Sequence, residues 1–161
     1  MIITATCRKN NIKVVITKYP IKLPFDKIEA KAKEHGVILN YFGTSAILRK
    51  KSWKLPLNLN GTEEINSSFE LCFKANVCTT LYEGKIYTCP TIACIKHFNK
   101  RFGTNLEVTE NDYIDIYAVE NIEDVLEFLC KPVPFCRYCN TKKPVYGMKW
   151  ERSKKEIEEW I

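Results

Sequence analysis

The chain has 161 residues, of which 45% are hydrophobic and 27% are charged, and its formal net charge is +6. This composition excludes an intrinsically disordered chain. The length allows one domain or slightly more, and a chain of this length is able to bury a core without stabilising disulfides or metals. The charge is modest for a nucleic-acid-binding protein, and no apolar run approaches the ~20 residues of a membrane span. We therefore expect neither a membrane nor a nucleic acid as the partner.

The first 45 residues predict a strand, a helix and a second strand. Residues 12–17 form a short β-branched run, residues 26–36 have a helical pattern that ends at Gly36, and residues 37–42 form a second apolar run. At this spacing the three elements make a βαβ unit, which requires two parallel strands in one sheet. Nothing later in the sequence clearly supplies further parallel strands. We interpret residues 1–45 as the remnant of a partial α/β barrel.

Residues 46–68 predict a connection with a short extended piece at 53–57, and residues 69–161 predict a second domain. Two short β runs, at 79–82 and 85–88, flank Glu83-Gly84 and predict a hairpin. Residues 91–102 predict a helix that stops at Gly103, and residues 121–129 predict a helix capped by Asn121. Ser153 and the glutamate three residues later have capping-box spacing, which predicts a short terminal helix.

The cysteine content needs an explanation, because a chain of this length does not need disulfides to fold. The eight cysteines are Cys7, Cys72, Cys78, Cys89, Cys94, Cys130, Cys136 and Cys139. No secretory signal precedes them, since Arg8 and Lys9 interrupt the apolar opening. The expected location is the reducing cytoplasm, where clustered cysteines indicate a metal rather than disulfides.

The spacing of the cysteines predicts a four-ligand site. Cys78 and Cys89 lie at the two outer ends of the predicted hairpin, which brings them within about one strand spacing, ~5 Å. Cys136 and Cys139 form a CxxC in a proline-bounded loop, a spacing that lets both thiolates face one centre. Cys72 is an additional ligand or a replacement for Cys78. The expected fold class is α+β, with the hairpin and helices arranged around this cysteine-ligated site.

The other candidate residues have ordinary structural interpretations. Cys94 and Cys130, on predicted helices, are interpreted as packing residues, and Cys7 as inert. His97 is interpreted as a hydrogen-bonded helix histidine rather than a ligand. Basic side chains near the CxxC are interpreted as a solvated face: Arg137, Lys142, Lys143 and Lys149.

The pattern Cys72-x11-Gly84-x4-Cys89 resembles the C-x(9–15)-G-x(4)-C signature that opens the SPASM and twitch domains. These are the C-terminal auxiliary-cluster domains of radical S-adenosylmethionine enzymes. Cys136-x2-Cys139 is similar to the later CxxC of the same domains, and the resemblance spans about residues 70–150. It implies a [4Fe–4S] cluster held by Cys89, Cys136, Cys139 and one or both of Cys72 and Cys78. In this family the preceding βαβ unit corresponds to the end of the partial barrel.

The sequence also departs from the family. It contains no C-x3-C-x2-C spacing, which holds the catalytic cluster in radical enzymes, and no cysteine follows Cys139. The shorter, single-cluster twitch form is therefore the better match. The resemblance implies an auxiliary-cluster module that relays electrons, positions substrate or has a structural role. Its expected partner is a catalytic radical S-adenosylmethionine domain, supplied in trans or lost by truncation.

An alternative function is a structural zinc module that binds a protein or a nucleic acid. Zinc takes the same four thiolates in tetrahedral geometry. The basic run between Arg137 and Lys155 contains aromatic residues, which are able to stack on nucleic-acid bases. Iron and zinc content distinguish the two functions.

Overall fold

The computed structural model describes residues 13–18, 23–42, 52–75 and 77–161. The chain divides into two units, and each is described by itself. The first holds the chain up to Ser52 together with Gly147–Arg152, and the second holds Trp53–Tyr146 and Ser153–Ile161. Helices occur with several small sheets rather than one large sheet, which confirms the predicted α+β class.

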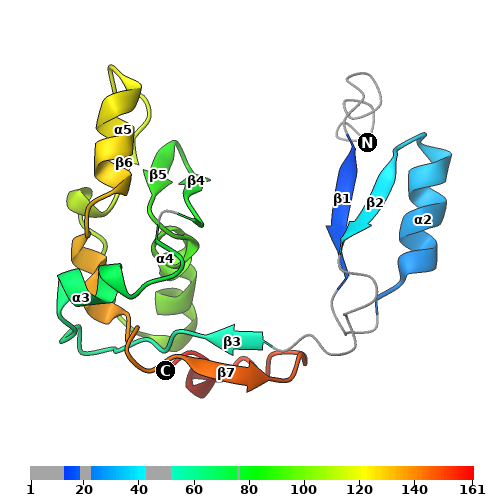
Figure 1. Ribbon diagram of the computed structural model, residues 1–161. Coiled ribbons are helices and arrows are strands. Elements are labelled where there is room, and N and C mark those ends of the chain that lie inside the picture. The colour runs from blue at the N-terminus through cyan, green and yellow to red at the C-terminus, as the bar shows by residue number, and fades with distance from the viewer. Residues whose placement is uncertain (1–12, 19–22, 43–51, 76) are drawn as a thin grey trace. The chain divides into compact units, whose positions relative to one another are not determined.

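The first unit contains the predicted strand–helix–strand arrangement. Strand β1 (Val14–Thr17) pairs with strand β2 (Leu39–Phe42), and helix α2 (Phe25–Glu34) connects them (Figure 1). The pairing is parallel, in register from Val14 opposite Leu39. Helix α2 ends in a Schellman motif, in which Gly36 has φ 62° and the Val37 amide donates to the Ala32 carbonyl at 2.9 Å. The parallel pairing inferred from the sequence is confirmed.

The strand pair of the first unit leaves apolar side chains exposed. In the part of the chain that the structure describes, the sheet has two strands, and Val15 and Phe42 are 62% and 66% exposed. Helix α2 buries no residue. Burial of apolar surface therefore contributes little to the stability of this unit as described.

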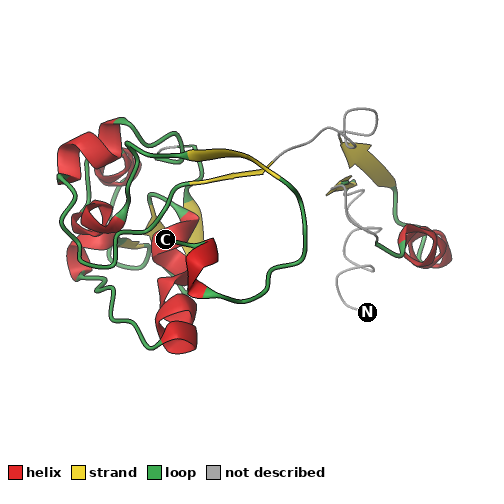
Figure 2. Ribbon diagram, turned by 90° about the horizontal axis from the view of Figure 1, so that it is seen from below, coloured by secondary structure: helices red, strands yellow, loops and turns green. Residues whose placement is uncertain are grey.

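The second unit is built from short elements joined by loops (Figure 2). In chain order its helices and strands are α3 (Ile65–Glu70), β4 (Thr80–Tyr82), β5 (Lys85–Tyr87), α4 (Pro90–Phe102), β6 (Ile114–Asp115) and α5 (Ile122–Leu129). Single 3₁₀ turns are η2 (Glu110–Asp112), η3 (Pro134–Tyr138) and η4 (Ile157–Glu159). Strands β3 (Ser52–Lys54) and β7 (Val145–Met148) pair with each other. None of the helices described in either unit has the length and apolar character needed to cross a lipid bilayer.

The predicted hairpin is present and carries a third strand. Strands β4 and β5 are antiparallel, with Thr80 opposite Tyr87, and both turn residues, Glu83 and Gly84, have positive φ (49° and 74°). This is the backbone of a type I′ turn, for which glycine is favoured. A Cβ on Gly84 would also lie 2.8 Å from the ring of Tyr117. Strand β6 extends the sheet beside β5; its two residues are too short to give a sequence signal.

Helix α4 forms the centre of the core of this unit. Pro90 occupies its first turn and Gly103, with φ 65°, ends it in the left-handed conformation. The buried core residues are Leu57, Tyr87, Cys89, Ile92, Ala93, Ile95, Phe98, Leu106, Val133 and Phe135. In Figure 1 the β4–β5 hairpin lies next to α4. One core cluster therefore contains residues of α4, of the hairpin (Tyr87) and of the turn that carries the CxxC (Phe135).

Two of the predicted helices differ in detail from the structure. The amide of Asp124 donates to the Asn121 side chain at 3.0 Å, so the predicted cap of α5 is confirmed. Two apolar residues of this helix, Ile122 and Leu126, are nevertheless exposed. The predicted terminal helix at residue 153 is wrong. The Ser153 hydroxyl accepts a hydrogen bond from the Lys155 amide, two residues on, and forms a local turn. The helical turn η4 begins only at Ile157.

Candidate metal centre

Four cysteines from separate places in the second unit lie around the start of helix α4. Cys72 follows helix α3, Cys89 is the N-cap of α4, Cys136 lies within η3 and Cys139 follows it. Cys89 is buried and the other three are partly buried. Each of Cys89, Cys136 and Cys139 is close enough to Cys72 to interact with it electrostatically, and Cys139 also interacts with Cys89 and Cys136.

Helix α3 holds the Cys72 segment against the CxxC turn. The Ser68 hydroxyl donates to the carbonyl of Cys139 at 3.0 Å, and the amide of Glu63 donates to the carbonyl of Arg137 at 3.0 Å. The helix begins at the Glu64 side chain, which accepts hydrogen bonds from the amides of Asn66 and Ser67. The hydrogen bonds of Ser68 and Glu63 bring together residues that are 71 and 74 positions apart in the sequence.

Asp112 fixes the CxxC turn from the other side. Its side chain is fully buried, and one carboxylate oxygen accepts a hydrogen bond from the Phe135 amide at 2.6 Å. The other oxygen accepts from the amide and the hydroxyl of Thr109, at 2.8 and 2.9 Å. The sequence interpretation missed this residue. The signal that finds it is the capping-box spacing from Thr109 to Asp112.

The environment of the sulfurs disfavours free thiolates. Burial raises the pKa of the Cys136 thiol to about 11, and the nearby Cys89 and Cys72 thiols add to the shift because two negative charges repel. Burial and the same neighbours raise the pKa of Cys139 as well. Burial also raises the pKa of Cys89, against hydrogen bonds from the Ile92 and Thr91 amides at the start of α4. Without a cation, Cys89, Cys136 and Cys139 are therefore uncharged thiols at neutral pH.

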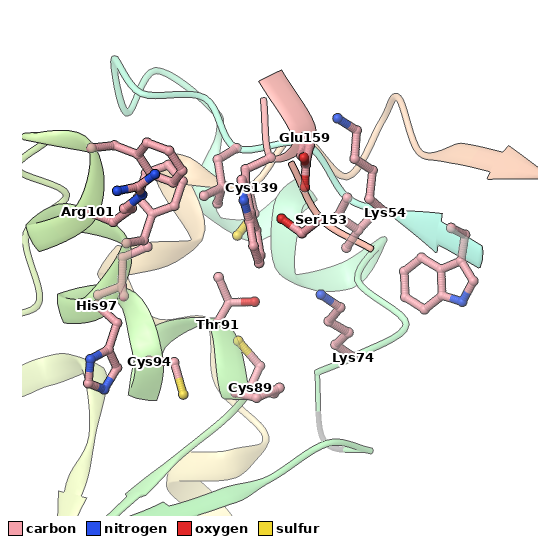
Figure 3. Close-up of a pocket in the computed structure, with 18 of the residues that line it drawn as sticks. Lys54, Lys74, Cys89, Thr91, Cys94, His97, Arg101, Cys139, Ser153 and Glu159 are labelled. Carbon is pink, nitrogen blue, oxygen red and sulfur yellow. The ribbon is translucent and has the colours of Figure 1, made fainter. Parts of the chain in front are cut away.

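Lys74 supplies a positive charge beside these thiols. Its ammonium group opposes the rise in pKa of both Cys89 and Cys139. Figure 3 shows it pointing toward the side of the cavity where Cys89 lies. The sequence interpretation missed Lys74 because it considered only the basic residues that lie near the CxxC in the sequence. Of those, Arg137 uses its Nε to donate to the carbonyl of Pro134 at 2.9 Å.

The remaining predicted site residue, Cys78, is separate from this group. It is exposed, and its amide donates to the carbonyl of Lys74 at 3.0 Å, which makes it part of a turn. The β4–β5 ladder begins at Thr80, so the hairpin does not extend to Cys78 and Cys89. The structure therefore brings Cys72, and not Cys78, beside the other three cysteines.

The interpretation of two further cysteines as packing residues is wrong. Cys94, within helix α4, and Cys130, the C-cap of helix α5, are both exposed. Cys7 lies outside the described residues. His97 is also exposed, and its Nε2 is 3.5 Å from the Tyr82 hydroxyl, a long contact for a hydrogen bond.

The chemistry of the donor set suits a thiophilic metal. Four cysteines with main-chain amides directed at sulfur are the ligands of iron–sulfur clusters and of structural zinc. Within the described residues, no three His, Cys, Asp or Glu side chains are placed closely enough to hold a metal ion as they stand. Metal binding at these four cysteines thus requires the thiols to move inward and lose their protons.

A cavity of about 820 Å³ opens next to the cysteines. Cys72, Cys89 and Cys139 form part of its wall, and Cys94 lies on the same wall (Figure 3). Aromatic side chains line much of the remainder: Trp53, Phe98, Phe102 and Trp160. The volume lies within the range of small-molecule sites, ~300–1,000 Å³.

Comparison with known proteins does not assign the chain to a family, because no protein-family model and no curated protein matches it.

Proposed function

We propose that the second unit is an auxiliary iron–sulfur module, in which Cys72, Cys89, Cys136 and Cys139 hold a [4Fe–4S] cluster. The observation that carries this proposal is that these four thiols, from three segments of the chain, lie within electrostatic range of one another around the start of α4. Four buried or partly buried thiols that repel one another as anions are stabilised together by one cationic metal core.

The resemblance of Cys72-x11-Gly84-x4-Cys89 to the twitch signature supports the same four ligands. Gly84 stands in the type I′ turn, where the signature requires a glycine, and the hairpin leads directly to Cys89. Cys78 is exposed and outside the group, which favours Cys72 as the first ligand.

The residues around the site have definable tasks in such a module. Asp112 holds the turn that presents Cys136, the amides of Thr91 and Ile92 stabilise negative charge on the Cys89 sulfur, and Lys74 offsets part of the cluster's charge. When bound, a cluster with four thiolate ligands transfers single electrons. The chain has no C-x3-C-x2-C spacing, so the proposed partner is a radical S-adenosylmethionine domain that supplies the catalytic cluster.

The test is metal analysis of the chain purified without oxygen, with Cys72→Ser and Cys78→Ser as a matched pair. We expect about four iron and four sulfide per chain, with absorbance near ~400 nm that bleaches on reduction. Cys72→Ser should lower the iron content severalfold, and Cys78→Ser should leave it unchanged.

One zinc and no iron, even after anaerobic reconstitution, would overturn the iron–sulfur proposal in favour of the zinc module. Loss of iron in Cys78→Ser with retention in Cys72→Ser would overturn the choice of the first ligand.

A further inference from the structure

The cavity beside the cysteines has two chemically different ends. Cys89, Cys139 and Lys74 lie at one of them (Figure 3). At the other, Arg101 on α4 contacts the C-terminal segment, where its Nη2 donates to the Lys155 carbonyl at 3.5 Å. Arg101 and Lys155 both line the cavity.

An aromatic wall runs along the Arg101 end of the cavity. The ring of Phe98 lies 4.8 Å from that of Phe102 and 6.0 Å from that of Trp160, centroid to centroid. The Trp160 carbonyl accepts a hydrogen bond from the Leu57 amide at 2.7 Å, and the residue as a whole is 49% exposed. A large aromatic surface is thus available to a ligand next to the guanidinium group of Arg101.

The basic side chains at this end form no ion pair within the described chain, and the Glu159 carboxyl group lines the same cavity. No salt bridge among residues 13–18, 23–42, 52–75 and 77–161 involves Arg101 or Lys155. Lys54 differs, because its ammonium donates to the carbonyls of Glu158 and Ile161. The acidic side chain on the wall, Glu159, accepts a hydrogen bond from the Lys154 amide.

We propose that this cavity binds a small aromatic molecule with an anionic group, with the anion between Arg101 and Lys155 and the ring against Phe98 and Trp160. A guanidinium group binds a carboxylate or sulfonate through two parallel hydrogen bonds. Apolar side chains beside such a pair lower the local dielectric constant, which strengthens the interaction. The opposite end of such a ligand then points toward Cys89 and Cys139. The proposal rests on the cavity and not on the cluster, so it holds for the metal-free chain as well.

The test uses two dyes that share one aromatic body. 8-Anilinonaphthalene-1-sulfonate carries a sulfonate, and N-phenyl-1-naphthylamine lacks it. Energy transfer from tryptophan to each dye reports binding, because Trp53 and Trp160 line the cavity. The variants are Arg101→Gln and Lys155→Gln, with Lys100→Gln as control, since Lys100 is exposed on the same helix but does not line the cavity.

We expect Arg101→Gln to weaken binding of the sulfonate dye by about tenfold and to leave the neutral dye unchanged. Lys155→Gln should act in the same direction, and Lys100→Gln should affect neither dye. Equal affinities for the two dyes, or an equal loss in Lys100→Gln, would overturn the anionic ligand class. Absence of tryptophan-to-dye transfer for both dyes would overturn the binding site itself. We expect these variants to leave the iron content unchanged. Measuring it therefore distinguishes a failure of the cavity proposal from a failure of the iron–sulfur proposal.

Discussion

At the scale of single residues, Asp112 has the clearest structural task in the second unit. It is fully buried, and its carboxylate accepts hydrogen bonds from the amides of Phe135 and Thr109, which donate to no other acceptor in the part of the chain that the structure describes. A buried amide without an acceptor costs roughly 1–3 kcal/mol, and hydrogen bonds to a charged acceptor are the stronger kind. Cys136 follows Phe135 directly, so the position of a candidate ligand depends on this contact.

We therefore expect Asp112→Ala to lower the free energy of unfolding by about 3 kcal/mol, as measured by urea denaturation. The iron content of the anaerobically purified variant should fall with it. Glu110→Ala is the control, because Glu110 is exposed in the same 3₁₀ turn and should change stability by no more than about 0.5 kcal/mol. Equal effects of the two substitutions would contradict the task assigned to Asp112.

At the scale of elements, helix α3 couples Cys72 to the CxxC, and its stability depends on one cap. Hydrogen bonds from the amide and hydroxyl of Ser67 and from the amide of Asn66 lower the pKa of Glu64 from 4.5 to about 2. A carboxyl group with a lowered pKa in the folded state stabilises that state above its unfolded pKa. The stabilisation is lost as the pH falls toward the folded pKa.

The difference in stability between the wild-type chain and Glu64→Ala should accordingly be constant above about pH 5 and shrink between pH 4.5 and about 2. Thermal unfolding at a series of pH values measures it. The control is Glu70→Ala, at the other end of the same helix, where no amide needs a cap. A difference that grows as the pH falls would have the wrong sign and exclude the capping role.

At the scale of the whole molecule, the two units differ in how much apolar surface they bury. Helix α4 of the second unit buries Ile92, Ala93, Ile95 and Phe98, whereas helix α2 of the first unit buries no residue. Local opening costs less free energy where fewer apolar contacts are lost.

Hydrogen exchange read by mass spectrometry tests this contrast in the intact chain. We expect peptides from α2 and from strands β1 and β2 to exchange much faster than peptides from α4. Equally slow exchange in both would contradict the prediction and indicate that the exposed faces of Val15 and Phe42 are covered by another surface. Repeating the experiment at several protein concentrations would identify self-association as the source.

The sequence determined the elements whose signals lie within a few neighbouring residues. The parallel βαβ unit follows from its apolar runs and Gly36, the hairpin from Glu83-Gly84, and the two longest helices of the second unit from Gly103 and Asn121. These signals act through backbone dihedral angles and caps, which are local. The capping-box spacing at Ser153 failed because a two-residue hydroxyl turn competed for the same side chain.

The tertiary structure decided which distant residues meet. The sequence left Cys72 and Cys78 as alternatives, because strand spacing favoured one and the family signature the other. The fold places Cys72 by packing α3 against the CxxC turn, and it ends the hairpin ladder before Cys78. Lys74 and the aromatic cavity went unnoticed for the same reason, since Lys74 acts on Cys89, 15 positions away, and the cavity joins Trp53 to Trp160, 107 positions away. Asp112 has a local capping-box signal, but its contact with the CxxC turn is made to the Phe135 amide, 23 positions away. Contacts over such separations are set by how the loops close around the core, which no local pattern records.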